Sequence, residues 1–248
     1  MPARVPLTLA PMAEGLVLHQ LLAGRDFALG DQFATTMRNH VYLLGDAGSG
    51  QALVVDPAYD VAGVLRCARE RGLTVVGVLA THYHADHVGG EVFGQHVEGL
   101  ADLLELVDVP VHVQGDEVPW VSEMSGAGPG HLVAHTDGDV VEVGEVAVRL
   151  LHTPGHTPGS QCFEVGDNLV SGDTLFLDGC GRTDLPGGDP AQMYESLTTR
   201  LARFDDTTVL YPGHRYAPEP SASLGDTRRR NYVFRLRTPE QWLAMFGT

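Results

Sequence analysis

The most informative stretch of this 248-residue sequence is THYHADHVGG, residues 81–90. It follows residues 75–80, a nearly continuous apolar run that predicts a strand buried on both faces. Three histidines and one aspartate stand among the six positions from His82 to His87. A surface cluster of solvated histidines is the alternative reading, but such close spacing of imidazoles rarely arises by chance and favours a metal site.

The spacing within this stretch predicts donors for two neighbouring ions. His82 and His84 are two residues apart at a strand end, so both side chains can point toward one ion. Asp86 and His87 fall where the chain turns into the next helix, and can face a second ion. Imidazole nitrogens and carboxylate oxygens suit Zn, Fe or Mn, whereas the lack of nearby cysteine pairs argues against a thiolate site.

Further candidate donors follow downstream, each at the end of a predicted strand. His156 lies within the turn-rich stretch TPGHTPGS, Asp173 closes the stretch LVSGD, and His214 follows LYPG. Taken singly, each is typical of a turn aspartate or a hydrogen-bonded loop histidine. Together they supply the remaining donors that the first cluster needs.

Apolar runs alternate with helical patterns over most of the chain. Strands are expected over residues 41–46, 52–57, 75–80, 111–114, 146–151, 161–165, 169–171 and 208–211, and helices over 59–71, 100–107 and 190–204. Residues 122–139 contain several Gly and Ser residues and one proline, which predicts a surface loop. The alternation predicts layers of sheet covered by helices, in a single domain over residues 1–248.

Composition excludes several classes of function. The apolar fraction of 43% is that of an ordinary globular protein. Acidic residues number 32 against 16 basic ones, a net charge of −16, and every basic residue is arginine. The absence of lysine excludes P-loop and Schiff-base chemistry. The negative charge disfavours nucleic acid as a partner.

Cysteine usage and targeting patterns indicate a cytoplasmic protein. Cys67, Cys162 and Cys180 are too few and too scattered for a disulfide framework, so reduced thiols are expected. Pro6, Pro11 and Glu14 interrupt the apolar residues among the first 20, which argues against a signal peptide. No stretch reaches the roughly 18 uninterrupted apolar residues of a membrane span, so no membrane partner is expected.

The four motifs THYHADHVGG, TPGHTPGS, SGDTLF and YPGH, in this order, resemble the metallo-β-lactamase superfamily. The resemblance implies an αββα sandwich, an α/β fold with the metal site at one edge between two sheets. Matched position by position, it implies that His82, His84 and His156 bind a first metal ion. It implies a second ion at Asp86, His87 and His214, with Asp173 as the carboxylate that bridges the two.

The segment GCGRTD, residues 179–184, resembles two branches of this superfamily. Glyoxalase II-type thioester hydrolases and persulfide dioxygenases both carry similar segments, and its Arg-Thr-Asp part is closer to the dioxygenases. The continuation LPGGD, residues 185–189, resembles compact glyoxalase II-like hydrolases. Ser160 stands where many dioxygenases have cysteine, and Asp173 where many true β-lactamases do.

The leading hypothesis is hydrolysis of a thioester by a hydroxide held between two divalent cations, expected to be zinc. Asp173 bridges the ions in this scheme, and Asp86 is both a ligand and the group that orients the hydroxide. The substrate is a small-molecule or carrier-bound thioester, because a thiolate leaves readily.

Two alternatives stay open. A single Fe(II) held by two histidines of the first site and Asp173 would make the protein a persulfide dioxygenase acting on a low-molecular-weight thiol persulfide. In that case Asp86, His87 and His214 would serve only as hydrogen-bond partners around the iron. The other alternative is a metal-binding fold used for partner recognition without catalysis.

Several residues outside the ligand set have two readings. Arg182 is either a carboxylate clamp for the substrate or half of a buried structural pair with Asp184. Tyr216 either contacts substrate or packs in the core. The pair His131 and His135 is expected in a loop, solvated or locally hydrogen-bonded, rather than at a third metal site. Tyr83 either lines the pocket or packs in the core. Other residues are expected to pack, to form local bonds or to stay inert: His112, His152, Cys180 and the basic run 228–230.

Overall fold

The computed structural model describes residues 15–92 and 94–247. Most of the N-terminal segment that argued against a signal peptide lies outside the described residues. No helix within the described part of the chain is long and apolar enough to cross a membrane. The described chain folds into two six-stranded sheets and one two-stranded hairpin.

The first sheet carries most of the N-terminal half in the order β1-β2-β3-β4-β7-β8. β1 to β3 run antiparallel, and β3, β4, β7 and β8 run parallel. Its strands are β1 (Leu16–Leu22), β2 (His40–Asp46), β3 (Gln51–Val55), β4 (Thr74–Leu79), β7 (Val111–Gln114) and β8 (Leu132–His135). The hairpin of β5 (Gly90–Val92) and β6 (Gln95–Val97) follows α3 (Ala85–Val88). The parallel strands all end at one edge, where the polar loops collect.

The second sheet carries the C-terminal half in the order β14-β13-β12-β11-β10-β9. Its pairs are antiparallel except for β12 and β13. Its strands are β9 (Val140–Val143), β10 (Val146–His152), β11 (Gln161–Val165), β12 (Asn168–Gly172), β13 (Val209–Pro212) and β14 (Ala222–Ser223). The parallel ends of β12 and β13 lead directly into Asp173 and His214.

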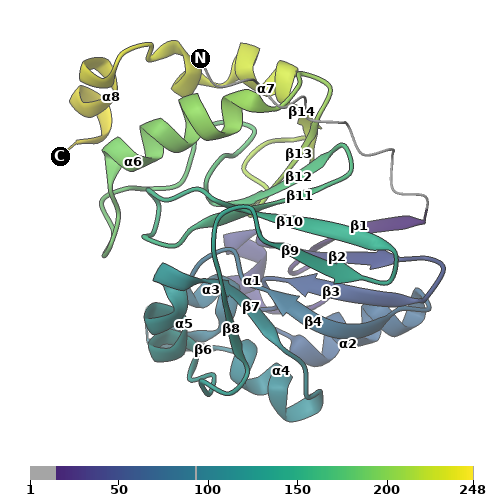
Figure 1. Ribbon diagram of the computed structural model, residues 1–248. Coiled ribbons are helices and arrows are strands. Elements are labelled where there is room, and N and C mark those ends of the chain that lie inside the picture. The colour runs from purple at the N-terminus through teal and green to yellow at the C-terminus, as the bar shows by residue number, and fades with distance from the viewer. Residues whose placement is uncertain (1–14, 93, 248) are drawn as a thin grey trace.

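Helices cover the outer face of each sheet (Figure 1). Below the first sheet in this view lie α2 (Val61–Glu70) and α4 (Leu100–Leu106), with α5 (Val118–Ser125) to the left. Helix α1 (Gln32–Met37) packs Ala34 into the same apolar layer. Above the second lie α6 (Pro190–Glu195), α7 (Leu224–Arg230) and α8 (Pro239–Phe246). Three apolar layers result: one under each helical cover and one between the sheets, where Leu44, Leu53 and Phe163 are buried. The expected αββα sandwich is therefore confirmed.

One expectation was wrong. Residues 122–139 are not a continuous loop, because α5 runs to Ser125 and β8 occupies Leu132–His135. The helix ends at Gly126, which takes the left-handed conformation that glycine tolerates best. β8 is an edge strand of four residues that is held by backbone hydrogen bonds to β7. A strand this short gives little signal in its own sequence.

Candidate metal centre

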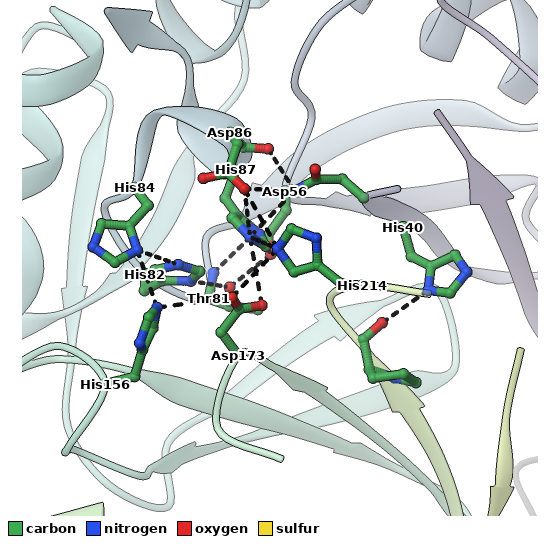
Figure 2. Close-up of polar contacts among 12 residues, drawn as sticks. His40, Asp56, Thr81, His82, His84, Asp86, His87, His156, Asp173 and His214 are labelled. Atoms are coloured by element: carbon green, nitrogen blue, oxygen red, sulfur yellow. Dashed lines mark hydrogen bonds and ion pairs between the residues drawn. The ribbon is translucent and has the colours of Figure 1, made fainter. Parts of the chain in front are cut away.

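The predicted donors meet at the edge where the two sheets adjoin. His82 and His84 stand in the loop after β4, and Asp86 and His87 on the short helix α3. His156 comes from the loop between β10 and β11. Asp173 directly follows β12, and His214 follows β13 after one residue, Gly213. Figure 2 shows all seven side chains converging on one small region.

The first group is His82, His84 and His156. His84 Nδ1 lies 3.1 Å from His82 Nε2 and 3.0 Å from His156 Nε2. His82 and His156 are buried and His84 is partly buried, and this burial lowers the pKa of each imidazole, that of His84 to about 4. The first group is therefore a set of neutral rings whose nitrogen lone pairs face one another, the form in which imidazole binds a metal.

In His82 and His156, the hydrogen bond made by Nδ1 determines that Nε2 carries no proton. His156 Nδ1 lies 2.6 Å from the carbonyl oxygen of Arg182, which can only accept, so this nitrogen donates. His82 Nδ1 lies 2.9 Å from Thr81 Oγ1, and that hydroxyl donates to Asp56 Oδ2 over 2.6 Å. In both rings Nε2 is left as the free donor atom, directed toward His84.

The second group is Asp86, His87 and His214. The Nε2 atoms of His87 and His214 are 3.2 Å apart, and Asp86 Oδ2 lies 3.6 Å from the first and 3.4 Å from the second. His87 donates from Nδ1 to Asp56 Oδ2 at 2.8 Å, and His214 donates from Nδ1 to the Met37 carbonyl at 2.8 Å. The free nitrogens thus face each other and one carboxylate.

Asp173 stands between the two groups. Its Oδ2 lies 3.3 Å from His214 Nε2 and 3.8 Å from His156 Nε2, and its Oδ1 lies 3.5 Å from His87 Nε2. Oδ1 is buried and has no hydrogen-bond partner among the described residues. A Cβ on Gly213 would collide with this oxygen, so the glycine of the YPGH stretch leaves room for the carboxylate.

The carboxylate and imidazoles of the second group, together with Asp173, shift one another's pKa values. Burial by itself would raise the pKa of Asp86 and Asp173, but the adjacent His87 and His214 hold both well below the usual range. Burial would also lower the pKa of His87 and His214, yet the carboxylates raise both. Without a cation the protein therefore needs protons on the second group, and a bound cation would replace them.

The donor set fits divalent metal ions. In the first group, nitrogens of neutral rings face one another at 3.0–3.1 Å, and beside them a buried oxygen of Asp173 has no hydrogen-bond partner among the described residues. Each group offers three donors within 4.8 Å of one another. Asp56 also lies within this range of His82 and His87, but its oxygens accept from Thr81 and His87 Nδ1, so it supports ligands rather than belonging to them.

Four supporting residues were not among the sequence candidates. Asp56, directly after β3, bonds Thr81 and His87, and it has a left-handed φ of 53°. Asn39 donates to Asp86 Oδ2 at 3.1 Å. For Asp56 a signal exists: it follows a buried strand at the same sheet edge as the ligands. Asn39 and Thr81 have no comparable pattern.

Glu117 is the fourth, and it joins the two loops of the first group. Its Oε1 accepts from the backbone N–H of Tyr83 at 2.8 Å and from Thr157 Oγ1 at 2.6 Å, and its Oε2 accepts from the N–H of Gly159 at 2.6 Å. Its side chain is almost fully buried. Burial raises its pKa, although these three hydrogen bonds act in the opposite direction. The carboxylate thereby fixes the loops that carry His84 and His156.

The predicted substrate contacts lie at the surface beside the centre. Arg182 pairs with Asp184 at 2.7 Å, but both side chains are about half exposed or more, so the pair is not buried as the structural reading expected. Tyr216 is 53% exposed and stacks on His214, with ring centroids 4.8 Å apart and planes 7° apart. Tyr216 is therefore not a core residue.

The remaining histidines stay outside the centre. His131 contacts Asp108, and His135 lies at the end of β8 rather than in a loop. His135 Nε2 is 2.8 Å from His112 Nδ1 on the adjacent strand, a pair with no third ligand among the described residues. His152 Nε2 donates to the Pro158 carbonyl. In the basic run, Arg228 and Arg229 pair with aspartates, as expected.

The two sheets thus meet at two groups of His and Asp side chains, each of which could hold a metal ion. The sequence model of the metallo-beta-lactamase superfamily matches residues 34–214. The chain belongs to the metallo-β-lactamase superfamily. Its members are mostly metal-dependent hydrolases or related enzymes, and they bind divalent metals.

Three relatives represent the range of similarity. The hydroxyacylglutathione hydrolase of Shewanella loihica is 36% identical over 179 residues, which are 72% of this chain and 62% of that protein. The crystal structure of ETHE1 from Myxococcus xanthus has a TM-score of 0.74 at 28% identity, covering 94% of this chain and 90% of that one. TTHA1623, solved in a di-iron-bound form, has a TM-score of 0.64 at 29% identity, covering 79% and 96%.

Proposed function

We propose that this protein hydrolyses a thioester at a centre of two divalent cations. The observation that supports it best is the position of Asp173. Its two oxygens lie within 3.3–3.8 Å of nitrogens from both groups, and Oδ1 has no other partner among the described residues. A carboxylate so placed fits between two cations.

The ligand assignment follows from the free donor atoms. His82, His84 and His156 would hold one cation, the second group the other, and Asp173 both. Bound divalent cations supply Lewis acidity, which lowers the pKa of water and polarises a carbonyl group. The di-iron form of TTHA1623 supports two ions, and we propose zinc as the metal, with iron as the alternative.

The protein's own residues prepare this site before substrate arrives. Asp56 and the Met37 carbonyl accept the Nδ1 protons of His87 and His214, so Nε2 is the atom that each ring presents to the site. Asn39 holds Oδ2 of Asp86, and Oδ1 of Asp86 has no hydrogen-bond partner among the described residues. Asp86 Oδ1 can accept a hydrogen bond from the attacking water and orient it.

The reaction places few demands on further side chains. The oxygen of water bonds to the acyl carbon, the carbon–sulfur bond breaks, and a carboxylic acid and a thiol result. The leaving thiol has a pKa near 8.5, so its thiolate leaves without a strong general acid. The Shewanella relative is a hydroxyacylglutathione hydrolase, a name that describes hydrolysis of an acylated glutathione, and it supports the same class of reaction here.

A thioester panel tests the proposal. Protein loaded with zinc, and separately with Fe(II), would be assayed on acyl-glutathione, acyl-coenzyme A and acyl-pantetheine by release of thiol. Turnover that disappears on chelation and returns with metal is expected. Rates equal to those of metal-free protein on every thioester would refute the proposal.

A second function is favoured by one segment of sequence. Arg182 to Asp184 resembles persulfide dioxygenases, and ETHE1 aligns over 94% of this chain. One Fe(II) on two first-group histidines and Asp173 would leave Asp86, His87 and His214 as hydrogen-bond partners. Oxygen uptake with glutathione persulfide by the iron-loaded protein supports this function, and a flat oxygen-electrode trace refutes it.

A further inference from the structure

A basic pocket lies next to the metal centre of this acidic protein. Its volume is about 520 Å³, and Arg25, Arg38 and Arg215 are among its lining residues. The net charge of the whole chain is −16, with only 16 basic residues in total. Three guanidinium groups around one pocket therefore stand out against the surrounding charge, and they are suited to an anion.

Two of these guanidinium groups have no neutralising partner. Arg25 forms a bidentate pair with Asp26, at 2.6 and 3.0 Å. Arg38 and Arg215 form no ion pair with a carboxylate anywhere in residues 15–92 and 94–247. Their backbones are directly bonded, since the N–H of Arg215 donates to the Arg38 carbonyl at 3.0 Å. Both residues line the same pocket, and two positive charges there favour an anion.

The backbone of Arg38 adds an independent observation. Arg38 ends α1 with φ of 60° and ψ of 36°, the left-handed conformation in which glycine is the least strained residue. A side chain here costs stability that glycine would not, and strain of this kind collects at functional positions. In this protein the strained residue is one of the two unpaired arginines of the pocket.

The pocket and the metal centre share a wall. Tyr216 lines the pocket and stacks on His214. Arg215 directly follows His214, and Arg38 directly follows Met37, whose carbonyl accepts from His214 Nδ1 at 2.8 Å. A molecule with its reactive group at the centre can therefore extend past Tyr216 into the pocket.

A second hollow, which Tyr216 also lines, has a volume of about 260 Å³. Asp178, Glu219 and Asp226 line it together with one arginine, Arg230. Acidic residues outnumber basic ones there, so an anionic part of a substrate is favoured in the basic pocket instead. Tyr216 thus borders both a basic pocket and a more acidic hollow beside the same centre.

We infer that the basic pocket binds a phosphate group on the thiol half of the thioester substrate. This inference rests on the proposed function and names its substrate class as acyl thioesters of a phosphate-bearing thiol. Two unneutralised guanidinium groups match a phosphate monoester, which carries about −1.5 to −2 at pH 7, better than a single carboxylate. The acyl carbonyl would then lie at the metal centre.

Equilibrium binding tests the pocket without any turnover. Isothermal titration calorimetry of the metal-loaded protein would compare coenzyme A, pantetheine, glutathione and inorganic phosphate. The variants are Arg38→Gly, which removes the charge and suits the left-handed backbone, and Arg215→Gln. Arg66→Gln on α2 is the control. We expect each pocket variant to weaken coenzyme A at least about tenfold, and the control to leave it unchanged.

The outcomes separate this inference from the proposed function. Weakened coenzyme A binding in protein that cleaves no thioester would uphold the pocket and refute the hydrolase. If thioesters are cleaved, the ratio of KM for acetyl-coenzyme A to that for acetyl-pantetheine should be below one and rise toward one in both variants. A ratio unmoved by the variants, tighter binding of glutathione than of coenzyme A, or inorganic phosphate binding as tightly as coenzyme A would overturn the inference.

Discussion

Asp56 Oδ2 accepts a hydrogen bond from His87 Nδ1 at 2.8 Å, and both side chains are almost fully buried. The same oxygen accepts from the hydroxyl of Thr81, which contacts His82. One carboxylate therefore sets the free nitrogen of a histidine in each group. A residue that contacts no substrate determines the donor atoms of both predicted sites.

Replacing Asp56 by asparagine should weaken metal binding and leave the fold intact. Asparagine tolerates the left-handed φ of 53° at this position. Its amide nitrogen would donate toward His87 Nδ1 and place the proton of that ring on Nε2, which then cannot bind metal. We expect the affinity of the second site to fall about 10- to 100-fold, measured by competition with a chromophoric chelator.

The matched control is Asp60→Asn. Asp60 caps α2 through a hydrogen bond from Gly63 N–H, and asparagine caps a helix about as well. Metal affinity should be unchanged in this variant. Equal affinities for wild type and Asp56→Asn would show that the contact to His87 does not tune the site.

Asp173→Asn tests the bridging position. The amide has one neutral oxygen in place of a charged pair, so it binds two cations poorly. Thioester turnover should fall at least about 100-fold, equivalent to about 3 kcal/mol in the barrier, while the circular dichroism spectrum stays that of the wild type. Turnover within a few-fold of wild type would exclude Asp173 from a bridging role.

Glu117 should contribute to both stability and metal binding at the first site. Glu117→Ala leaves the N–H groups of Tyr83 and Gly159 and the Thr157 hydroxyl without their acceptor. We expect the unfolding free energy to drop by about 3 kcal/mol, and metal content to decrease because two ligand loops lose their connection. Urea denaturation and elemental analysis measure the two effects.

The exposed Glu123 on α5 provides the comparison for Glu117. Glu123→Ala removes a carboxylate that makes no hydrogen bond within the described part of the chain, and it should change neither quantity. An unchanged metal content in Glu117→Ala, together with a loss of stability, would limit Glu117 to a purely structural role.

The half-buried His112 should make stability depend on pH. Burial, together with the adjacent His135, lowers its pKa to about 4. The unfolded chain takes up a proton near pH 6.5 and the folded chain only near pH 4, so unfolding becomes easier as pH falls between these values. The contribution is about 1 to 2 kcal/mol after allowance for partial exposure, and it is fully present above pH 6.5.

His112→Asn removes this contribution, since an amide does not titrate. The unfolding free energy of the variant should decrease less than that of the wild type between pH 7 and pH 4.5. Replacing the exposed His96 by asparagine controls for the loss of a histidine as such. Parallel curves for wild type and His112→Asn would contradict the assignment.

Sequence patterns predicted most of the elements because the signals are local. Apolar and polar residues do not alternate over Val75–Ala80 as they would in a half-exposed strand. Most of this run lies in β4, which is covered on both faces. The spacing of His82, His84, Asp86 and His87 placed these residues correctly on a loop and a short helix. The downstream candidates could be named for the same reason, since each follows a short apolar run that ends in a turn.

Other features depend on contacts between distant segments. Glu117 lies 40 residues from Thr157 in sequence, and Asn39 lies 47 from Asp86, so no local pattern connects them. β8 exists because β7 supplies its hydrogen bonds. The exposure of the Arg182–Asp184 pair depends on packing around the loop, which the two residue types do not encode.

The most direct test of the two-metal account is elemental analysis of protein purified without added metal. The account predicts about two divalent ions per chain, with zinc the metal proposed. It also predicts about one ion per chain in Asp56→Asn, through loss of the second site. One iron per wild-type chain and no zinc would contradict the account and favour the persulfide dioxygenase.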